Sequence, residues 1–175
     1  MGLFMNSSTL PPTSHDPASQ DYQYPVSNHP YYEQVHAFGS GIVADQATEG
    51  HRNRWRELFT DRLSFDNRAL HVEIGCNGGH FLIARAKSHP ECAYIGLDWK
   101  YKQVYRAGVK ARKNGAPNTL FLRARAERLG VMFGPGEIDF LYCLFPDPWP
   151  KNSDVEHRFI TPRWLNSIAP SVRPG

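Results

Sequence analysis

The chain has 175 residues, of which 41% are hydrophobic, and its 20 Lys and Arg against 17 Asp and Glu give a net charge of +3. This composition is ordinary for a soluble globular domain. No stretch approaches the ~18 consecutive apolar residues of a membrane span, and residues 1–10 lack the basic region and apolar core of a secretion signal. We therefore expect one cytoplasmic domain without a membrane partner.

Charge is unevenly distributed along the chain. Residues 1–50 contain five acids and no Lys or Arg, so residues 51–175 hold all 20 basic residues and only 12 acids. A basic body is compatible with a polyanion, because neutralised phosphates release counterions, although many cytosolic enzymes share such an excess. Cys76, Cys92 and Cys143 form no CxxC pair and have no His at metal-ligand spacing, so we expect reduced structural thiols and no metal.

The N-terminal part predicts a tail followed by an arm. Residues 1–30 are rich in Pro, Ser, Thr, Asn and Gln, which predicts a disordered tail. Aromatic side chains and a Gly-Ser-Gly turn follow in residues 31–50, which indicates an arm that packs on the domain. Residues 52–59 predict a short helix with Trp55 on its apolar side. We assign residues 31–68 to this arm and helix.

From residue 69 to residue 175, expected strands and helices alternate. The strands are expected at 70–75, 92–97, 119–122 and 138–145, and the helices at 79–88, 100–113 and 161–169. The last strand is the most apolar segment and is expected to be buried on both faces. This alternation predicts an α/β fold with a doubly wound, mostly parallel, Rossmann-like sheet. Four strands are few for such a sheet, so we expect the domain's C-terminal part to be missing.

The first expected strand ends in a glycine-rich turn, EIGCNGG, at residues 73–79. Glycines allow backbone to approach a ligand closely, and a helix N-terminus supplies free N–H donors. Asp98 ends the second expected strand, where an acid can bind the two ribose hydroxyls of an adenosine. Together these features favour an adenosine cofactor over a tight turn that binds nothing.

Glu73 distinguishes between adenosine cofactors. The spacing of Gly75, Gly78 and Gly79 does not fit GxGxxG, and a carboxylate against this turn would repel a pyrophosphate. It suits a cofactor that is cationic on this side, such as S-adenosylmethionine with its amino group and sulfonium. The alternative is that Glu73 pairs with a buried Arg or Lys.

A second motif, FPDPWPK, occupies residues 145–151, directly after the most apolar strand. Ligands of open α/β sheets bind beyond the carboxyl ends of strands. Each proline disfavours helix at the residue before it, so Phe145, Asp147 and Trp149 are expected to be extended and to project to a common side. Asp147 can accept the Watson–Crick N–H groups of guanine while Trp149 stacks on the ring. The alternative is a rigid exposed loop.

Three motifs stand in the order and spacing of a known family: EIGCNGGHF, IGLDWK with the following VYRA, and FPDPWPK. They resemble the tRNA (guanine-N7)-methyltransferase family, and the upstream WRELF fits its N-terminal region. The last motif is specific to that family, whereas most S-adenosylmethionine-dependent methyltransferases share the glycine turn. The resemblance implies methyl transfer to N7 of a guanosine in the variable loop of tRNA.

The resemblance also implies roles for single residues. Glu73 and Asp98 correspond to the family's acidic cofactor residues, and Gly75 and Gly79 match its glycines. Asp147 resembles the acid near the sulfonium and the target base, so it is expected to be catalytic and to contact the cofactor. The residues expected to bind the tRNA substrate are Lys151, Trp149 and Arg158.

The sequence departs from the family pattern at two places. Arg125 aligns with the family's acid or amide next to the adenine, so a cofactor contact is expected from an unusual side chain. The segment after Lys151 is poor in basic residues, with one basic pair at His157 and Arg158. The tRNA could instead be bound by three arginines upstream, Arg52, Arg54 and Arg56. The alternative is that these arginines form a solvated helix face.

The expected chemistry needs no general base, because guanine N7 bears a lone pair and no proton. Two other functions stay open. The first is a methyltransferase with another substrate, since a fold does not determine the substrate. The second is a noncatalytic nucleotide-binding remnant, which Arg125 and the depleted basic segment favour. The sequence leaves open whether the protein is a monomer or a homodimer.

Overall fold

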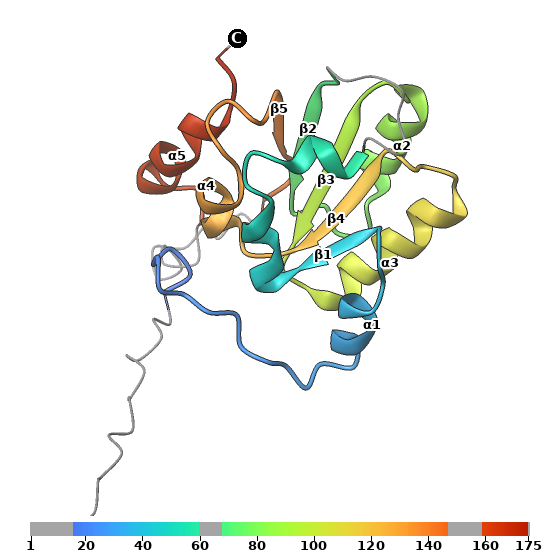
Figure 1. Ribbon diagram of the computed structural model, residues 1–175, viewed down its shortest axis with the longest axis horizontal. Helices are drawn as coiled ribbons and strands as arrows, with labels where there is room; N and C mark the ends of the chain where they lie inside the picture. The colour runs from blue at the N-terminus through green and yellow to red at the C-terminus, as the bar shows by residue number, and fades with distance from the viewer. Residues whose placement is uncertain (1–15, 60–67, 147–158, 175) are drawn as a thin grey trace, which may run out of the picture.

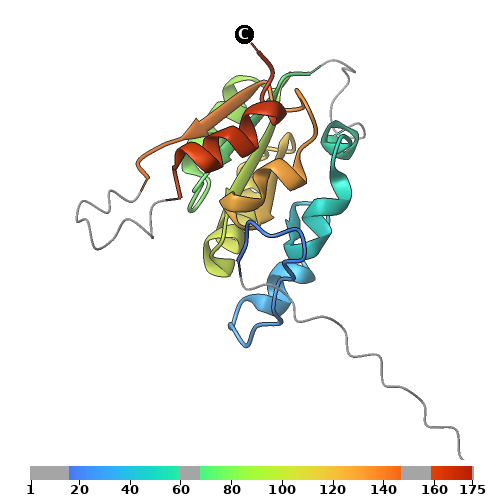
Figure 2. The same ribbon diagram turned by 90° about the vertical axis from the view of Figure 1, so that its left-hand side faces the viewer.

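The computed structural model describes residues 16–59, 68–146 and 159–174. In this part of the chain, five parallel strands form one sheet with helices on both faces (Figures 1 and 2), in the order β1-β4-β3-β2-β5. The strands are β1 Ile42–Ala44, β2 Leu70–Ile74, β3 Ala93–Asp98, β4 Thr119–Arg123 and β5 Phe140–Cys143. The predicted α/β class and Rossmann-like sheet are confirmed.

The order of the strands defines where a ligand can bind. The chain runs from β2 through β3 to β4 in one direction, and β5 then pairs with the other side of β2. Glu73 on β2 therefore lies opposite Gly96 of β3 and Tyr142 of β5. In parallel α/β sheets, such a reversal opens a crevice at the carboxyl ends of the central strands.

Helices alternate with the strands. The α-helices are α1 Tyr32–His36, α2 His80–Ser88, α3 Tyr101–Lys113, α4 Leu129–Met132 and α5 Pro162–Ile168. The 3₁₀ helices are η1 Asp45–His51, η2 Trp55–Phe59, η3 Ala126–Arg128 and η5 Ala169–Ser171. As predicted, Thr161 caps α5: its hydroxyl accepts the backbone N–H of Trp164 at 3.1 Å, and Pro162 follows at the first helical position.

The sheet separates two hydrophobic clusters. Leu70, Val72 and Ile74 of β2 point to one face, where they join buried side chains of η2, α4 and α5, including Trp55 and Trp164. On the other face, residues of α1, α2 and α3 pack with β4. This alternation along β2 sends Glu73 to the side of α2 and α3.

The N-terminal arm contributes a strand that the sequence pattern does not reveal. β1 pairs with β4 at the edge of the sheet, from Ile42 opposite Phe121 to Ala44 opposite Arg123. The disordered tail was expected to reach residue 30, but several residues between 16 and 30 contact the domain. Tyr22 is buried, and the backbone N–H of Arg125 donates to the Tyr24 hydroxyl at 3.1 Å.

The arginines before β2 hold the arm to the domain. The Arg52 guanidinium donates to the carbonyl oxygens of Gly130 and Phe133 at 2.5 and 2.6 Å. Arg56 binds the Asp139 carboxylate at 2.6 Å. These contacts give Arg52 and Arg56 partners within the protein, although Arg52 stays exposed, and a tRNA contact from either residue stays a prediction. The expected helix there is the 3₁₀ helix η2, on which Trp55 is buried as expected and Phe59 is buried as well.

The expectation that segment 138–145 is buried on both faces is wrong. β5 is shorter, and in the described part of the chain it pairs only with β2. Phe140 is 50% exposed and Phe145 is 98% exposed. An apolar run alone does not distinguish a central strand from an edge strand, because both have the same composition on their covered face.

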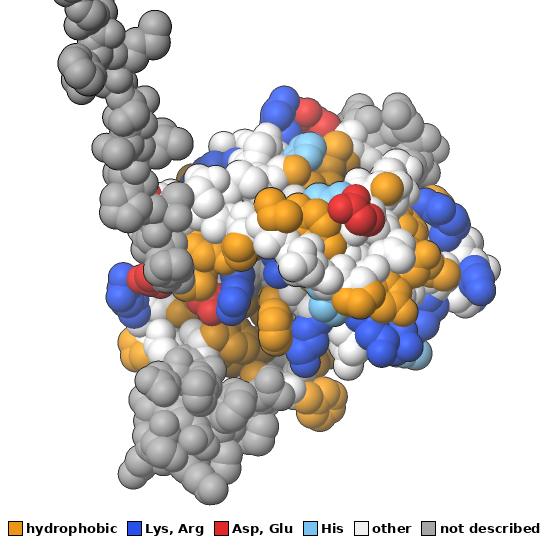
Figure 3. Space-filling model, turned by 90° about the horizontal axis from the view of Figure 1, so that it is seen from below, with side chains coloured by type: hydrophobic (Ala, Val, Ile, Leu, Met, Phe, Trp, Pro, Cys, Tyr) orange, Lys and Arg blue, Asp and Glu red, His pale blue; other side chains and the backbone are white. Residues whose placement is uncertain are grey.

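The surface carries mixed side chains with a local excess of positive charge. Figure 3 shows Lys and Arg side chains gathered on the right of the face seen there, over α3. Among the described residues, no helix is both long and apolar enough to cross a bilayer. The described part also contains no cluster of three or more His, Cys, Asp or Glu side chains that would suit a metal ion.

Candidate active site

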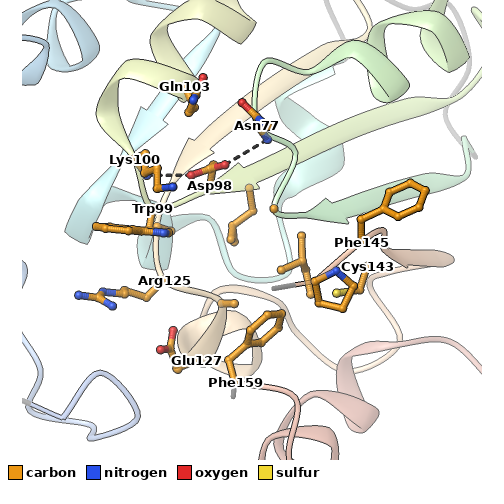
Figure 4. Close-up of a pocket in the computed structure, with 16 residues that line it drawn as sticks. Asn77, Asp98, Trp99, Lys100, Gln103, Arg125, Glu127, Cys143, Phe145 and Phe159 are labelled. Carbon is orange, nitrogen blue, oxygen red and sulfur yellow. Dashed lines mark hydrogen bonds between the residues drawn. The ribbon is translucent and has the colours of Figure 1, made fainter. Parts of the chain in front are cut away.

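A cavity of about 520 Å³ opens at the carboxyl ends of β2 to β5, where the strand order reverses. Its walls come from the turn after β2, the end of β3, the segment after β4 and the end of β5 (Figure 4). The residues that these walls contribute include Gly75, Asn77, Asp98, Trp99, Lys100, Arg125, Cys143 and Phe145.

The glycine-rich turn forms the wall beside β2. The backbone N–H groups of Gly75 and Cys76 both donate to the Leu97 carbonyl, at 2.8 and 3.0 Å, which ties the turn to the end of β3. Gly75 has φ +71°, in the left-handed region that favours glycine, and a Cβ there would meet no atom within 4 Å. Gly75 therefore turns the chain and leaves room for a ligand beside the backbone.

Asp98 lies at the floor of the cavity, between the turn and the start of α3. One carboxylate oxygen accepts the backbone N–H of Lys100 at 2.8 Å, and the other accepts that of Asn77 at 3.1 Å (Figure 4). Burial raises the pKa of Asp98, although both N–H groups oppose this effect. Each carboxylate oxygen has a second lone pair, so the fixed Asp98 can accept two further hydrogen bonds from a pair of hydroxyls.

Glu73 lies behind the turn and carries a buried carboxyl oxygen without a partner. Its exposure is 5%, and Oε2 has no hydrogen-bond partner among the described residues. Glu73 forms no ion pair with a described Arg or Lys. This argues against the alternative that Glu73 is paired with a buried cation. Burial, together with the charge of Asp98, raises the pKa of Glu73 to about 7. Glu73 and Asp98 thus place two acids beside the turn, which disfavours an anion there, whereas the cations of Lys100 and Arg125 lie by Trp99.

Trp99 and Arg125 form the wall opposite the turn. Trp99 is 53% exposed, and the side-chain cations of Lys100 and Arg125 each lie 5.5 Å from the centre of its ring. Arg123 fixes the Trp99 backbone, because its Nε donates to the Trp99 carbonyl at 3.0 Å. An exposed indole held in this way offers a flat surface to an aromatic ring.

Gly79 serves packing in this structure. It precedes α2 with φ +69°, and a Cβ there would lie 2.8 Å from the Phe121 ring and 3.0 Å from Ala107. Gly79 thus allows α2 to approach β4 and α3. Neither Gly79 nor Glu73 is among the residues that line the cavity, so their contact with a cofactor stays a prediction.

The structure thus brings together three of the expected cofactor residues: Gly75, Asp98 and Arg125 line one cavity. Phe145, expected to be extended before Pro146, instead has φ +51°, so that part of the loop prediction is wrong. The remaining expected residues lie outside the described part of the chain; they are Asp147, Trp149, Lys151 and Arg158.

Sequence reasoning missed other residues of the cavity. Trp99 and Lys100 directly follow Asp98, and this adjacency was a signal that they share its site. Cys143 lies at the end of β5, which was likewise a usable signal. Phe159 lines the cavity from the segment before α5, and no sequence pattern marks it.

The fold and the glycine turn define the class as a Rossmann-like methyltransferase fold. The chain is similar to the solved structure of the aminoglycoside resistance methyltransferase NpmB1, with 27% identity, a TM-score of 0.51, and coverage of 69% of this chain and 58% of that one. The 16S rRNA methyltransferase KamB shows the same fold at 23% identity and a TM-score of 0.53, over 70% of this chain and 54% of that one.

Sequence comparison identifies the family. A family model described as "Putative methyltransferase" matches residues 67–175, and the chain belongs to this family. It is 34% identical over 126 residues to a tRNA (guanine-N(7)-)-methyltransferase of Geobacillus kaustophilus, which covers 72% of this chain and 55% of that protein. The Enterococcus faecalis protein of the same name is 33% identical, over 74% and 58%. The chain spans just over half the length of these curated relatives.

Proposed function

We propose that this protein transfers a methyl group from S-adenosylmethionine to N7 of a guanosine in the variable loop of tRNA. The cavity at the reversal of strand order, with Asp98 held at its floor, is the observation that carries the proposal. The names of the relatives add the substrate. Residues 69–175 are proposed as the methyltransferase domain, residues 31–68 as its arm, and the cytoplasm as its location.

The residues of the cavity fit S-adenosylmethionine. This cofactor supplies a methyl group on a positively charged sulfur. Asp98 has the free lone pairs to accept two ribose hydroxyls, and Trp99 offers a flat apolar surface beside them. The unpartnered buried carboxyl of Glu73 adds negative potential behind the turn, which favours a cation at this end. Arg125 would contact the adenosine from the opposite wall.

The chain's residues would promote the reaction by placement. Guanine N7 has an in-plane lone pair, so no proton has to be removed from it. Asp147 would accept the N–H groups of the guanine edge, Trp149 would stack on the ring, and Lys151 and Arg158 would contact tRNA. Holding the reacting atoms in line can lower the barrier by up to ~7–11 kcal/mol.

The first test is direct. Incubation of the protein with unmodified tRNA and S-adenosylmethionine labelled in its methyl group, followed by chemical cleavage at 7-methylguanosine, should yield one labelled product cut in the variable loop. Label in a metabolite pool but not in tRNA would favour another substrate. Stabilisation by S-adenosylhomocysteine without any methyl transfer would favour a noncatalytic nucleotide-binding protein.

The second test separates catalysis from cofactor binding. Because Asp147 is proposed to orient guanine, Asp147→Asn should lower kcat by about a hundredfold or more, as expected when an oriented catalytic group is lost. The Kd of S-adenosylhomocysteine, measured by calorimetry, should change much less. Full turnover in the Asn variant would exclude Asp147 from the mechanism.

A further inference from the structure

A row of basic side chains follows the outer face of α3. Lys102, Arg106 and Lys113 are exposed and Lys110 is half-buried, and their spacing of three or four residues places them on one side of the helix. The sequence contains no acid between Asp98 and Glu127. Among the described residues, no salt bridge involves this row. Like charges at this spacing repel, so the row weakens the helix that carries it.

A groove lies between this row and the glycine turn. It has a volume of about 490 Å³, and its walls include Gly78 and His80 on one side and Arg106, Lys110 and Lys113 on the other. Asn77 and Gln103 line both this groove and the candidate active site. The groove therefore adjoins the cavity in which the methyl donor is proposed to bind, with Asn77 and Gln103 between them.

Within the row, Lys110 is already engaged by the protein. Its ammonium group donates to the Gly78 carbonyl at 2.8 Å and lies 2.6 Å from His80 Nε2. Burial, together with the charge of Arg106, lowers the pKa of Lys110. Lys110 thus holds the turn in place, whereas the exposed cations of Arg106 and Lys113 face the groove without an acidic partner among the described residues. An external anion between them would relieve their repulsion.

The length and the composition of the basic row indicate which class of ligand fits it. From Lys102 to Lys113 the helix rises ~16 Å, at 1.5 Å per residue, which exceeds the reach of one phosphate group. The row contains cations and no large exposed apolar side chain, so it lacks the apolar anchor of a membrane-binding helix. A polymer with regularly spaced phosphates matches both features.

We propose that the groove between the glycine turn and α3 binds the phosphodiester backbone of RNA, with Arg106 and Lys113 neutralising its phosphates. This site deepens the proposed function, on which it rests for the identity of the RNA. It supplies, in a groove beside the cavity, the positive charge that the segment after Lys151 lacks. RNA would then be held close to the methyl donor by the backbone as well as by its target base.

The test compares two double variants with equal loss of charge. Arg106→Gln/Lys113→Gln removes the two free cations and leaves Lys110 on the turn. Lys87→Gln/Arg163→Gln removes two exposed cations from α2 and α5, outside the groove. The Kd of an unmodified tRNA transcript is measured by filter binding at several NaCl concentrations. The first variant should lower the slope of log Kd against log salt by ~1.4–1.8, the value for two phosphate contacts.

The control variant should keep the wild-type slope, and both variants should bind S-adenosylhomocysteine as tightly as the wild type. Equal slopes in the two variants would overturn the inference even if tRNA is methylated. Binding to anionic phosphatidylserine vesicles but not to tRNA would also overturn it, as would a loss of S-adenosylhomocysteine affinity in the first variant. A wild type that binds RNA through this row without methylating it would refute the proposed function and support the groove.

Discussion

Replacing Glu73 with Gln should stabilise the protein, and the gain should grow with pH. Glu73 is buried, its Oε2 has no described partner, and burial with the nearby charge of Asp98 raises its pKa from 4.5 to about 7. The folded state therefore prefers the neutral carboxyl group. Stability from this preference is complete below pH 4.5 and is lost as the pH rises through 7, because the folded carboxylate must then ionise where it is poorly solvated.

The magnitude follows from the two pKa values. Each tenfold difference in proton affinity corresponds to ~1.36 kcal/mol, so Glu73 lowers the free energy of unfolding, relative to a side chain that stays neutral, by about 3 kcal/mol at pH 8 and about 1 kcal/mol at pH 5. Gln has nearly the same shape and no charge, so Glu73→Gln removes this cost. The free energy of unfolding should therefore rise by ~2 kcal/mol more at pH 8 than at pH 5.

Urea denaturation followed by circular dichroism measures both free energies without a ligand. Glu33→Gln, the same substitution at an exposed position on α1, is the matched control and should show no such pH dependence. A Gln variant that is equally stable or less stable at pH 8 would mean that the Glu73 carboxylate is hydrated or paired. The turn would then have no electrostatic preference for a cation.

Two further variants test the glycine turn and the floor of the cavity. Gly79→Ala should lower the free energy of unfolding by ~1–3 kcal/mol more than Gly115→Ala. Both positions have positive φ, but an added Cβ is crowded only at Gly79; equal losses, measured by urea denaturation, would exclude the packing role. Asp98→Asn should weaken S-adenosylhomocysteine binding about ten- to a hundredfold, as expected for lost charge-assisted hydrogen bonds. Unchanged affinity by calorimetry would remove Asp98 from the cofactor site.

Local signals predicted the central part of the fold well. β2, β3 and β4 lie where the pattern placed them, and α5 starts at Thr161 because the cap and the proline act within one turn. β1 escaped prediction because three residues are too few to show a period, and its strand form depends on pairing with β4. The position of β5 at the edge is likewise a property of the assembled sheet.

In the candidate site, too, some residues could be predicted from local signals and others depend on the assembled fold. The role of Asp98 could be predicted because the end of a strand is visible in the sequence, and an acid at that position is more easily explained by a ligand than by packing. The surroundings of Trp99 could not be predicted, because they are formed by Arg123 and Arg125 at the end of β4 and by Tyr24 from the N-terminal segment, which meet only in the folded chain. The burial of Glu73 was visible from its apolar strand, but its lack of a described partner required the structure.

The contact between Tyr24 and Arg125 leads to a last prediction, that the segment before the arm, residues 16–30, stabilises the wall of the active site. The Tyr24 hydroxyl accepts the Arg125 backbone N–H at 3.1 Å, and burial raises the pKa of Tyr24 to about 12, so the hydroxyl stays protonated in any ordinary assay. Tyr24→Phe leaves this N–H without its partner, which costs ~1–2 kcal/mol and should speed exchange of the Arg125 amide hydrogen about 5–30-fold.

Tyr22→Phe is the matched control for this experiment, because Tyr22 is a buried neighbour whose ring packs against Arg128. It should leave the exchange of the Arg125 amide unchanged. If Tyr24→Phe also leaves it unchanged, the segment around Tyr24 contacts the domain without supporting the cavity. If exchange rises only in the Tyr24→Phe variant, residues outside the methyltransferase domain hold part of the site in place. Residues 1–50 contain no Lys or Arg, so the segment around Tyr24 then contributes by supporting Arg125 and not by attracting RNA.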